Sequence, residues 1–515
     1  MSQQSTQTTT GGSSEKIDKA VIRIAIVVVL GAIMSILDTT VVSVAQNTFQ
    51  TEFHTSAANA AWTATGYTLA LAAVIPLSSW AAARFGTRKI YLISIVLFVL
   101  GSVLCALAWN IGSLVAFRML QGAGGGMLMP VGMMILTRAA GPERVGSVMA
   151  VLGIPMLLGP ILGPILGGLL IEYASWHWIF LINLPIGILA FIYSYVTLPG
   201  GEETSKPTFD FVGLLLLSPG LAIFLYGVSE SNAAGTFLTA KVLIPMAVGA
   251  VLIIAFVFHS LRGKNPLLDL HLFRNKTLRW AVITMTLFMI AFFGAMLLFP
   301  QYFIGVRGES TLMAGLLVAP QGLGAMVTMP IAGRMTDQIG PGKFVLGGIV
   351  LIVAGMTTFV FLGADTSYWL LCSALFVMGL GMGMTMMPIM SAALATLTAD
   401  KVADGSTLMN VVQQAAASIG TAVISVILAS HLKSSPTSGM AILSNTDPKT
   451  YDKLAGAQQV PATPPHEWFE SAANAFGDTF IVAVVLIAIT FLPSLMLPRK
   501  RIANSDASSA PVAMH

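Results

Sequence analysis

The chain has 515 residues, of which 9% are charged and 56% are hydrophobic, and its formal net charge is +4. Soluble domains contain about 25% charged residues, so this composition excludes an ordinary soluble enzyme or nucleic-acid-binding protein. Residues 90–117 and 145–171 carry no charge, and each run exceeds the ~20 residues that a helix needs to cross a bilayer. A β-barrel would show short alternating segments instead. We therefore predict an all-α polytopic membrane protein.

In chain order, fourteen apolar segments are predicted to span the membrane. They cover residues 22–47, 58–81, 90–108, 111–137, 146–171, 177–197, 211–230, 238–259, 280–303, 312–333, 344–363, 368–395, 405–430 and 473–496. An even number of spans puts both termini on one side, and the segments on that side hold 20 of the 26 Lys and Arg residues. This bias favours cytoplasmic termini. We expect a multi-pass protein of a bacterial inner membrane.

Two loops of the chain resemble each other. Residues 79–89 read "SWAAARFGTRK" and residues 333–343 read "GRMTDQIGPGK". At an offset of 254, three residues of the first copy meet their like in the second: Pro76 and Pro330, Gly86 and Gly340, Lys89 and Lys343. A weaker echo joins "GGGMLMP" (124–130) to "GMGMTMMP" (381–388). Two related six-helix units suit a transporter that rocks one half against the other around a central site.

The repeat predicts five parts of the chain. The two tails are expected to be cytoplasmic, and the first of them disordered. Between the halves lies a linker with two additional spans, and the second half includes an outer loop, 431–472. In chain order the parts are the tail 1–20, the first half 21–197, the linker 198–278, the second half 279–497 and the tail 498–515.

The fifth predicted span contains "LLGPILGPILGG" at residues 157–168. Its glycines recur every four residues and so share one helix face, where another helix can approach closely. Pro160 and Pro164 each remove a backbone donor and favour a bend. The stretch is either a packing motif alone or part of a moving interface. Its candidate residues are Gly159, Gly163, Pro164, Gly167 and Gly168.

Asp38 is the one acidic residue deep within a predicted span, and Arg118 is the one basic residue. At 1.5 Å per residue they lie ~14 and ~10 Å from the outer ends of their spans, so we expect them to meet. An unpaired charge at such depth costs a few kcal/mol or more. The pair is interpreted as a proton switch in which Asp38 binds a proton or a cationic substrate. The alternative is a static ion pair that fixes helix packing.

Three polar or aromatic residues near the pair are candidates for a substrate cavity. Gln121 lies three residues beyond Arg118 on the same helix face, where it would bond Arg118 or a substrate, or only support packing. Trp62 and Tyr67 would line the cavity, or, for Trp62 above all, mark the membrane interface.

Five motifs, in order and at matching spans, resemble the Major Facilitator Superfamily, and specifically the fourteen-span drug:proton antiporters typified by EmrB and QacA. The resemblance covers residues 20–497. Its motifs are "ILDTTVVSVA" (36–45), "RFGTRK" (84–89), "RMLQGAGGG" (118–126), the glycine-rich stretch of the fifth span, and "SWHWIFLINLPIG" (175–187), which has His177 where Arg is usual. The resemblance implies proton coupling through Asp38 and Arg118.

The same resemblance implies that the two loops take part in gating, through Arg84, Gly86 and Arg88 in the first copy and Gly333, Asp337 and Gly340 in the second. The first copy departs from the family pattern, because Ser79 and Ala83 stand where Gly and Asp are usual. The resemblance also places the fifth span at the interface of the halves. We expect the span 312–333, with its small-residue stretch "APQGLGAM", to be the partner of Gly163.

We therefore expect a proton-driven exporter of lipophilic, cationic drugs that acts within the lipid bilayer and needs no cofactor other than the proton gradient. Alternatives are export of an endogenous lipid or metabolite, and an integral membrane enzyme. The seven histidines show no metal-ligand spacing, so no metal site is predicted, and no nucleic-acid partner is expected. The sequence carries no signal for or against a periplasmic adaptor.

Overall fold

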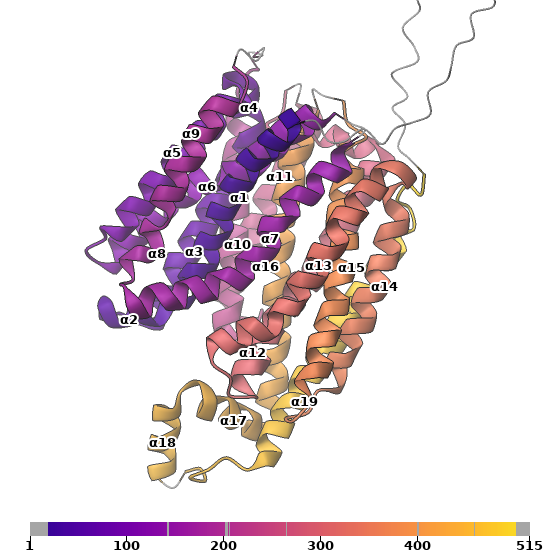
Figure 1. Cartoon of the computed structure of the whole chain (residues 1–515). Helices are drawn as coiled ribbons and strands as arrows, with labels where there is room; N and C mark the ends of the chain where they lie inside the picture. Colours follow the sequence, from indigo (N-terminus) through magenta and orange to yellow (C-terminus); the bar gives the residue numbers. More distant parts are fainter. Residues whose placement is uncertain are drawn as a thin grey trace, which may run out of the picture.

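The computed structural model describes residues 19–141, 144–200, 204, 207–263, 265–398, 401–457 and 459–500. The predicted tails 1–20 and 498–515 therefore lie almost entirely outside the described residues. All regular secondary structure in the described part is helical. In the described part of the chain, fourteen spans run roughly side by side in one bundle, and three of them are built from more than one helical piece (Figure 1).

The helices follow one another as the apolar pattern predicts. The first six spans are α1 (Lys19–Val44), α3 (Ala57–Val74) with η1 (Ile75–Leu77) and α4 (Ser78–Phe85), α5 (Thr87–Ala106), α6 (Ile111–Ala140), α7 (Val145–Tyr173), and α8 (His177–Leu181) with α9 (Asn183–Thr197). Then come α10 (Phe211–Ala234) and α11 (Ala240–Arg262). The last six are α12 (Lys276–Gly305), α13 (Thr311–Ile339), α14 (Pro341–Thr358) with η4 (Phe359–Phe361), α15 (Tyr368–Leu394), α16 (Val402–Ser434) and α19 (His466–Ser494).

Several of these helices begin where a polar side chain caps their first turn. Ser56, Asn110, Asn275 and Ser310 accept hydrogen bonds from backbone N–H groups at the starts of α3, α6, α12 and α13. Such caps satisfy donors that have no partner within the helix and so fix where it starts.

Thirteen helical segments are long and apolar enough to cross a membrane. Helix α7 is a further helix of 29 residues with no charged residue before Glu172. Each of the fourteen predicted spans thus corresponds to a helix. The predicted outer loop 431–472 differs from expectation, because α16 and α19 extend into it and α17 (Pro436–Thr446) and α18 (Pro448–Gly456) form a helical lobe there (Figure 1).

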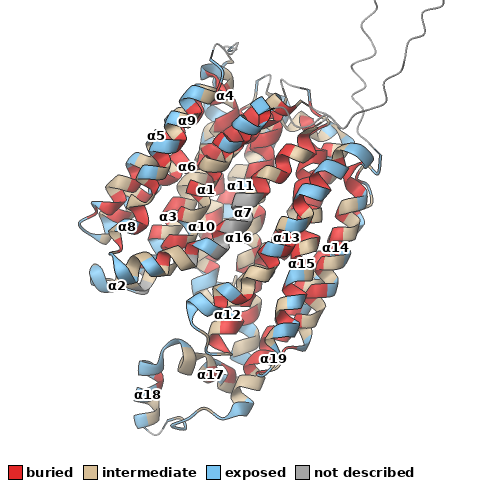
Figure 2. Ribbon diagram, viewed as in Figure 1, coloured by how far each residue is buried: buried red, intermediate tan, exposed pale blue. Residues whose placement is uncertain are grey.

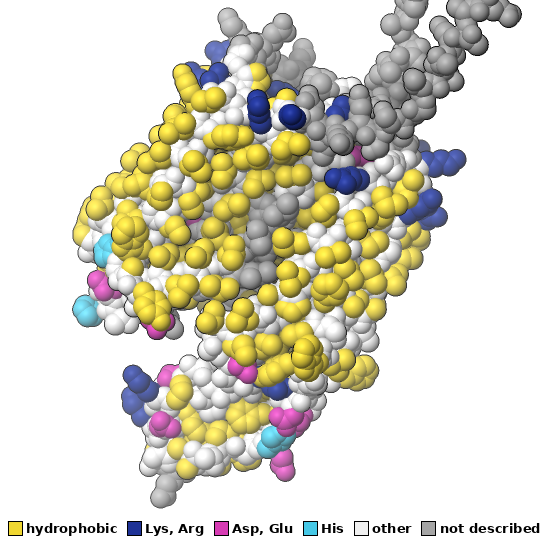
Figure 3. Space-filling view, viewed as in Figure 1, with side chains coloured by type: hydrophobic (Ala, Val, Ile, Leu, Met, Phe, Trp, Pro, Cys, Tyr) yellow, Lys and Arg dark blue, Asp and Glu magenta, His cyan; other side chains and the backbone are white. Residues whose placement is uncertain are grey.

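The bundle has one strongly basic end, which we call the basic end. It carries Arg84, Arg88, Arg138 and Arg144, where α4 and α6 end and α5 and α7 begin. Figure 3 shows dark blue Lys and Arg side chains at this end and a broad band of hydrophobic side chains across the middle of the visible face. The lobe of α17 and α18 lies at the opposite end.

Burial separates the central helices from the peripheral ones. Among the thirteen membrane-crossing segments, α6 has the largest buried share, 72%, and α11 the smallest, 17%. Figure 2 shows buried residues running through the interior of the bundle. Helix α10 packs beside α11 and touches both α3 and α16. Helix α10 therefore bridges the first and second halves at the rim of the bundle, and α11 packs on α10.

The predicted repeat reappears in the backbone. Gly86 between α4 and α5 has φ 86°, and Gly340 between α13 and α14 has φ 91°. Only glycine adopts such angles without strain. This explains why the two loop copies share a glycine at that position.

The repeat extends to helix packing. A Cβ atom built on Gly122 would lie 2.4 Å from the carbonyl oxygen of Tyr67, and one built on Gly379 would lie 1.9 Å from that of Gln321. Tyr67 and Gln321 differ by the offset of 254 found in the loops, and the two glycines differ by 257. The same pairing recurs one turn later for Gly126 against Leu71 and Gly383 against Ala325. Helices α3 and α6 thus pack as α13 and α15 do.

Candidate functional site

The two deep charges meet, as their predicted depths indicate. Arg118 lies two turns into α6, and its Nη1 atom donates directly to Oδ2 of Asp38 on α1. Asp38 is 2% exposed and Arg118 is 0% exposed. The ion pair therefore lies wholly within the bundle, where removal of one partner typically costs ~3–5 kcal/mol.

Two amides complete the surroundings of Asp38. Nε2 of Gln121 donates to Asp38 Oδ1 over 2.7 Å, and Nδ2 of Asn183 donates to the same oxygen over 3.1 Å. Both amide groups also donate to Oγ of Ser102, over 3.1 and 3.0 Å. We call Asp38, Arg118, Gln121, Asn183 and Ser102 the charge network.

Sequence reasoning missed two members of this network. Asn183 lies within the quoted motif 175–187, so its place in that motif was the available signal. Ser102 lies in the uncharged run 90–117 and gives no signal of its own. It occupies a fixed position because its hydroxyl donates to the carbonyl of Phe180 over 2.9 Å.

Arg118 has further partners that hold its guanidinium in place. Its Nε donates to the carbonyl of Thr63 over 3.0 Å, and its Nη1 donates to Oε1 of Gln121 over 2.7 Å. Its guanidinium carbon lies 4.2 Å from the ring centroid of Tyr67. A cation over an aromatic face is stabilised electrostatically, most strongly where water is absent. The tyrosine hydroxyl lies 3.0 Å from Oγ of Ser35.

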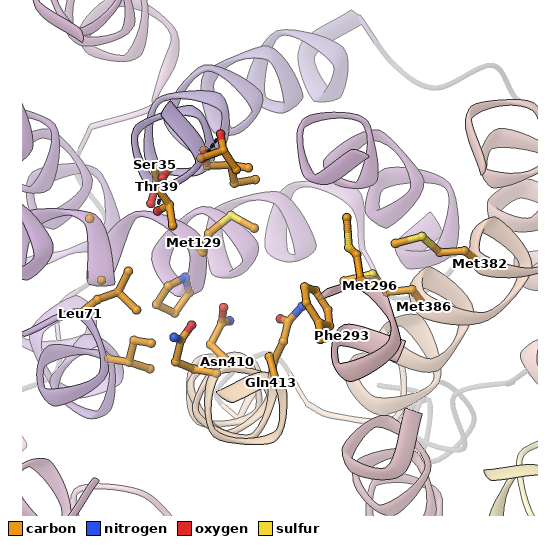
Figure 4. Close-up of a pocket in the computed structure, with 18 of the residues that line it drawn as sticks. Ser35, Thr39, Leu71, Met129, Phe293, Met296, Met382, Met386, Asn410 and Gln413 are labelled. Carbon is orange, nitrogen blue, oxygen red and sulfur yellow. Dashed lines mark hydrogen bonds between the residues drawn. The ribbon is translucent and has the colours of Figure 1, made fainter. Parts of the chain in front are cut away.

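A cavity of about 310 Å³ lies between the two halves. Its lining comes from both halves, namely from helices α1, α3, α6, α12, α13, α15 and α16. None of the described residues that line the cavity is charged. Figure 4 shows Asn410 and Gln413 of α16 beneath Met129, with Phe293, Met296, Met382 and Met386 on the side of the second half. Methionine side chains are flexible and polarizable, so such a wall can adapt to apolar ligands of different shape.

The charge network lies behind the cavity wall. Asp38 does not line the cavity, although its neighbours Ser35 and Thr39 do. Tyr67 is 1% exposed and stands between Ser35 and Arg118. The cavity and the ion pair are therefore separate, and Ser35 and Tyr67 connect them.

The structure places the three predicted cavity residues outside the described lining. Gln121 is 0% exposed and bonded within the charge network. Tyr67 lies behind Ser35. Trp62 stacks on Tyr226 of α10, with ring centroids 5.5 Å apart, and is 38% exposed. It attaches an inserted helix to the first half and does not reach the cavity.

The glycine face of α7 packs against α1, which corrects the expected partner. A Cβ atom on Gly163 would lie 2.0 Å from Oγ1 of Thr40, and one on Gly159 would lie 2.0 Å from Cγ2 of Ile36. Thr40 Oγ1 also donates to the carbonyl of Gly159 over 3.1 Å. Gly167 packs beside Val41, whereas Gly168 has open space. The side chain of Pro164 lies outside the described residues.

Helix α13, the expected partner, contacts α7 nearer the basic end. There Asp337 accepts hydrogen bonds from the backbone N–H groups of Gly146 and Ser147, over 2.8 and 2.9 Å, and from the Ser147 hydroxyl over 2.7 Å. A carboxylate is stabilised at a helix N-terminus by unpaired N–H groups and by the helix dipole. A Cβ atom on Gly333 would lie 2.7 Å from the carbonyl of Gly146. The second loop thus clamps the start of α7.

The first loop has alanine at residue 83, the position equivalent to Asp337, so it offers no carboxylate there. Of its predicted gating residues, Arg84 is exposed, and Arg88 donates to the carbonyl of Tyr195 over 2.7 Å, within its own half. The halves meet there through the hydroxyls of Ser78 and Thr407, 2.9 Å apart.

The segment after α11 lies beside the first loop, and the two line a cavity of about 450 Å³. Asp269 forms an ion pair of 2.9 Å with Lys401, next to the start of α16. Ser79 donates to the carbonyl of Leu267 over 3.4 Å. Burial opposes ionisation of Asp269, but bonds from Lys401 and His271 outweigh it and lower its pKa below the ordinary value. We call residues 265–275 the linker strap.

Three side chains with metal-binding atoms meet at the end opposite the basic end, although the histidine spacing predicts no metal site. Ligand atoms of Asp365, His466 and Glu470 lie within 4.8 Å of one another. Nε2 of His466 lies 2.7 Å from Oδ2 of Asp365, and the side chains of Asp365 and His466 are 80% and 61% exposed. The contact joins the start of α19 to the loop between η4 and α15, and we assign it no metal.

Comparison with known proteins agrees with this architecture. Residues 28–421 match the model of the Major Facilitator Superfamily. The chain is 46% identical over 502 residues to a multidrug resistance protein B homolog of Mycobacterium tuberculosis, covering 96% of this chain and 93% of the relative. It is 31% identical over 405 residues to the putative multidrug resistance protein MdtD of Escherichia coli, covering 78% and 85%.

Solved structures show the same fold. The human organic anion transporter MFSD10 superposes with a TM-score of 0.59 at 16% identity, covering 91% of this chain and all of that one. The proton:xylose symporter XylE superposes with a TM-score of 0.55 at 15% identity, covering 92% and 96%. Together with the family match, the helical bundle and its internal repeat show that this chain belongs to the Major Facilitator Superfamily of membrane transporters.

Proposed function

We propose that the chain exports lipophilic small molecules in exchange for protons, with Asp38 as the proton-binding group. One observation carries the proposal: Asp38 is the single carboxylate buried among the described residues, and it lies directly behind a neutral, apolar cavity. Ionisable groups inside a membrane are expensive and usually serve transport. The relatives named for multidrug resistance support export of drug-like compounds.

The geometry suggests how a proton would act on the cavity. Ionised Asp38 accepts bonds from Arg118, Gln121 and Asn183. A proton on Asp38 removes the charge that holds Arg118 and turns one acceptor site into a donor, so this set of bonds has to rearrange. Tyr67 rests on Arg118 and bonds Ser35 in the cavity wall. Movement of Arg118 would therefore reach the substrate site.

In this proposal Asp38 binds the proton, and the residues that line the cavity bind the substrate. The oxygens of Asp38 are already bonded to three side chains, and Asp38 does not line the cavity. A cationic substrate would thus find no carboxylate among the described lining residues. We accordingly propose lipophilicity, and not positive charge, as the shared property of the substrates.

The basic end is proposed to face the cytoplasm of a bacterium, because Lys and Arg concentrate on that side of membrane proteins. In the structure the halves touch there through Asp337 and the start of α7. Opening of that contact would admit substrate from the cytoplasm. We propose gating roles for Gly333, Asp337 and Gly340, and for Arg84, Gly86 and Arg88 in the first loop.

The test uses the purified full chain in liposomes with an imposed pH gradient, followed by uptake of the dye Nile red. Asp38→Asn fills a similar volume but cannot titrate, so gradient-driven uptake should be abolished. Retained dye binding without a gradient checks that the variant has folded despite the loss of the charge opposite Arg118. Asp365→Asn, at the exposed ion pair near α19, is the matched control and should transport as the unaltered chain does. Unaltered uptake by Asp38→Asn would remove the proton role.

A further inference from the structure

We infer that Gln321 forms a subsite that selects uncharged substrates bearing a hydrogen-bond acceptor, such as a carbonyl or ether oxygen. The inference rests on the proposed function and deepens it, because it names the chemistry that the cavity recognises. It starts from one polar atom. Nε2 of Gln321 is buried and has no hydrogen-bond partner within the described part of the chain.

An orphaned amide donor is uncommon, because buried polar groups almost always have a partner. Gln321 is 3% exposed and its side chain lines the cavity, near Met382 and Met386 of α15 and Phe293 and Met296 of α12. These neighbours are apolar. A rotation of the Gln321 side chain would bring this unpartnered donor to a ligand in the cavity.

The backbone of Gln321 is fixed by close helix packing. Its carbonyl oxygen would lie 1.9 Å from a Cβ atom on Gly379, so α13 and α15 are in close backbone contact at this residue. One turn further, a Cβ atom on Gly324 would lie 2.2 Å from the carbonyl oxygen of Phe376. The side chain of Gln321 therefore starts from a rigid backbone beside a flexible methionine wall. Rigid donors with adaptable apolar contacts fix the orientation of varied ligands.

The subsite differs in kind from the charge network. Asp38 and Arg118 satisfy each other behind the wall. Gln321 lines the cavity, bears a neutral amide, and has no charged residue beside it among the described lining residues. A neutral donor pairs with a neutral acceptor without the cost of burying an uncompensated charge. A hydrocarbon has no acceptor atom, so this donor adds nothing to the affinity of the cavity for it.

The experiment measures equilibrium binding of three dyes to the purified full chain, without any pH gradient. Nile red is uncharged and has a carbonyl acceptor, diphenylhexatriene is an uncharged hydrocarbon, and ethidium is a monocation. Gln321→Met removes the donor at similar volume. It should weaken Nile red binding about two- to tenfold, the worth of one hydrogen bond, and leave diphenylhexatriene binding unchanged. Gln321→Glu should instead favour ethidium.

Equal weakening of both uncharged dyes, or no change for either, would overturn the inference. Gln321→Asn keeps an amide and should retain part of the preference for Nile red, which covers the case in which the methionine variant does not fold. Because binding is measured without a gradient, the result is independent of proton coupling. Intact selectivity with no gradient-driven uptake would refute the proposed function alone. Gradient-driven uptake with the same dye preference in the unaltered chain and in the Gln321 variants would refute the subsite alone.

Discussion

The two halves of the transporter use one packing scheme for different chemistry. Tyr67 on α3 and Gln321 on α13 occupy equivalent positions, each with its carbonyl against a glycine of the next packed helix. In the first half, Tyr67 covers Arg118. At the offset of 257 that relates α6 to α15, Leu375 and Met378 stand where Arg118 and Gln121 stand, and both are fully buried.

This difference indicates a division of labour. Glycine contacts preserve the backbone geometry in both halves, while the buried charged side chains of the described residues are confined to the first half. The second half offers a neutral wall of methionines and amides. Repeated backbone packing leaves side-chain chemistry free to diverge, because close glycine contacts involve the backbone alone. The following changes test that division, in order of expected effect.

Removal of the arginine should have the largest effect. Arg118→Ala leaves Asp38 buried without its cation, at a cost of ~3–5 kcal/mol, and should both abolish transport and lower the thermal unfolding temperature in detergent. Leu375→Met, at the equivalent position of the second half, keeps volume and should cost less than ~1.5 kcal/mol. If both variants lost transport equally, the charged and neutral halves would not differ in role.

A side chain on the glycine face of α7 should have the next largest effect. Gly163→Leu forces α7 away from Thr40 of α1, and overpacking of this kind costs ~1–3 kcal/mol. Dye efflux from cells should fall and the unfolding temperature should drop. Gly168→Leu is the matched control, since a Cβ there meets nothing within 4 Å. Identical behaviour of the two variants would show that the α1–α7 contact is not needed for transport.

The sequence predicts what depends on local pattern and on the cost of burial. Fourteen helices follow from apolar runs, because a backbone in lipid must satisfy its own hydrogen bonds. The contact of Asp38 with Arg118 follows from depth and the expense of unpaired charge. The shared glycine of the two loops is visible in their repeat, and in the structure both Gly86 and Gly340 have a positive φ.

Other features depend on how each helix is rotated about its axis, which no local pattern states. The glycine face of α7 could have met any small-residue helix, and it meets α1 because Ile36 and Thr40 fit there. In the sequence, Ser102 and Asn183 look like ordinary polar residues of a membrane helix. The bonds of Asn183 to Asp38 and to Ser102 form only where α1, α5 and α9 pack together. The linker strap also escapes prediction, since its contacts with Ser79 and Lys401 are long-range.

Loss of the second-loop clamp should have a moderate effect, because Asp337 is the carboxylate that this loop supplies to the start of α7 and the first loop has Ala83 at the equivalent position. Asp337→Ala removes the acceptor at the start of α7, and loss of such a cap costs ~0.5–2 kcal/mol. A cysteine placed at Ala150, 4% exposed beside Gly333, should react with maleimide about two- to thirtyfold faster. Cys105 and Cys372 are replaced by Ser in this background. Asp365→Asn is the control, and an unchanged labelling rate in Asp337→Ala would count against gating by this loop.

The smallest effect is expected from the pH sensitivity of the linker strap. Bonds from Lys401 and His271 lower the pKa of Asp269 below its ordinary value of 3.8. A lowered folded-state pKa means that the bridge to Lys401 contributes its stability above pH 3.8 and loses it as pH falls through the lower, folded value. The strap should therefore stay closed throughout pH 5 to 8, the range in which transport is assayed. Asp269→Asn should shift the unfolding temperature by the same amount at pH 5 and at pH 8. It should leave the shape of the pH profile of dye uptake unchanged. Any pH dependence of uptake is then assigned to the charge network. If Asp269→Asn flattened the profile, the pH dependence would instead be assigned to the linker strap.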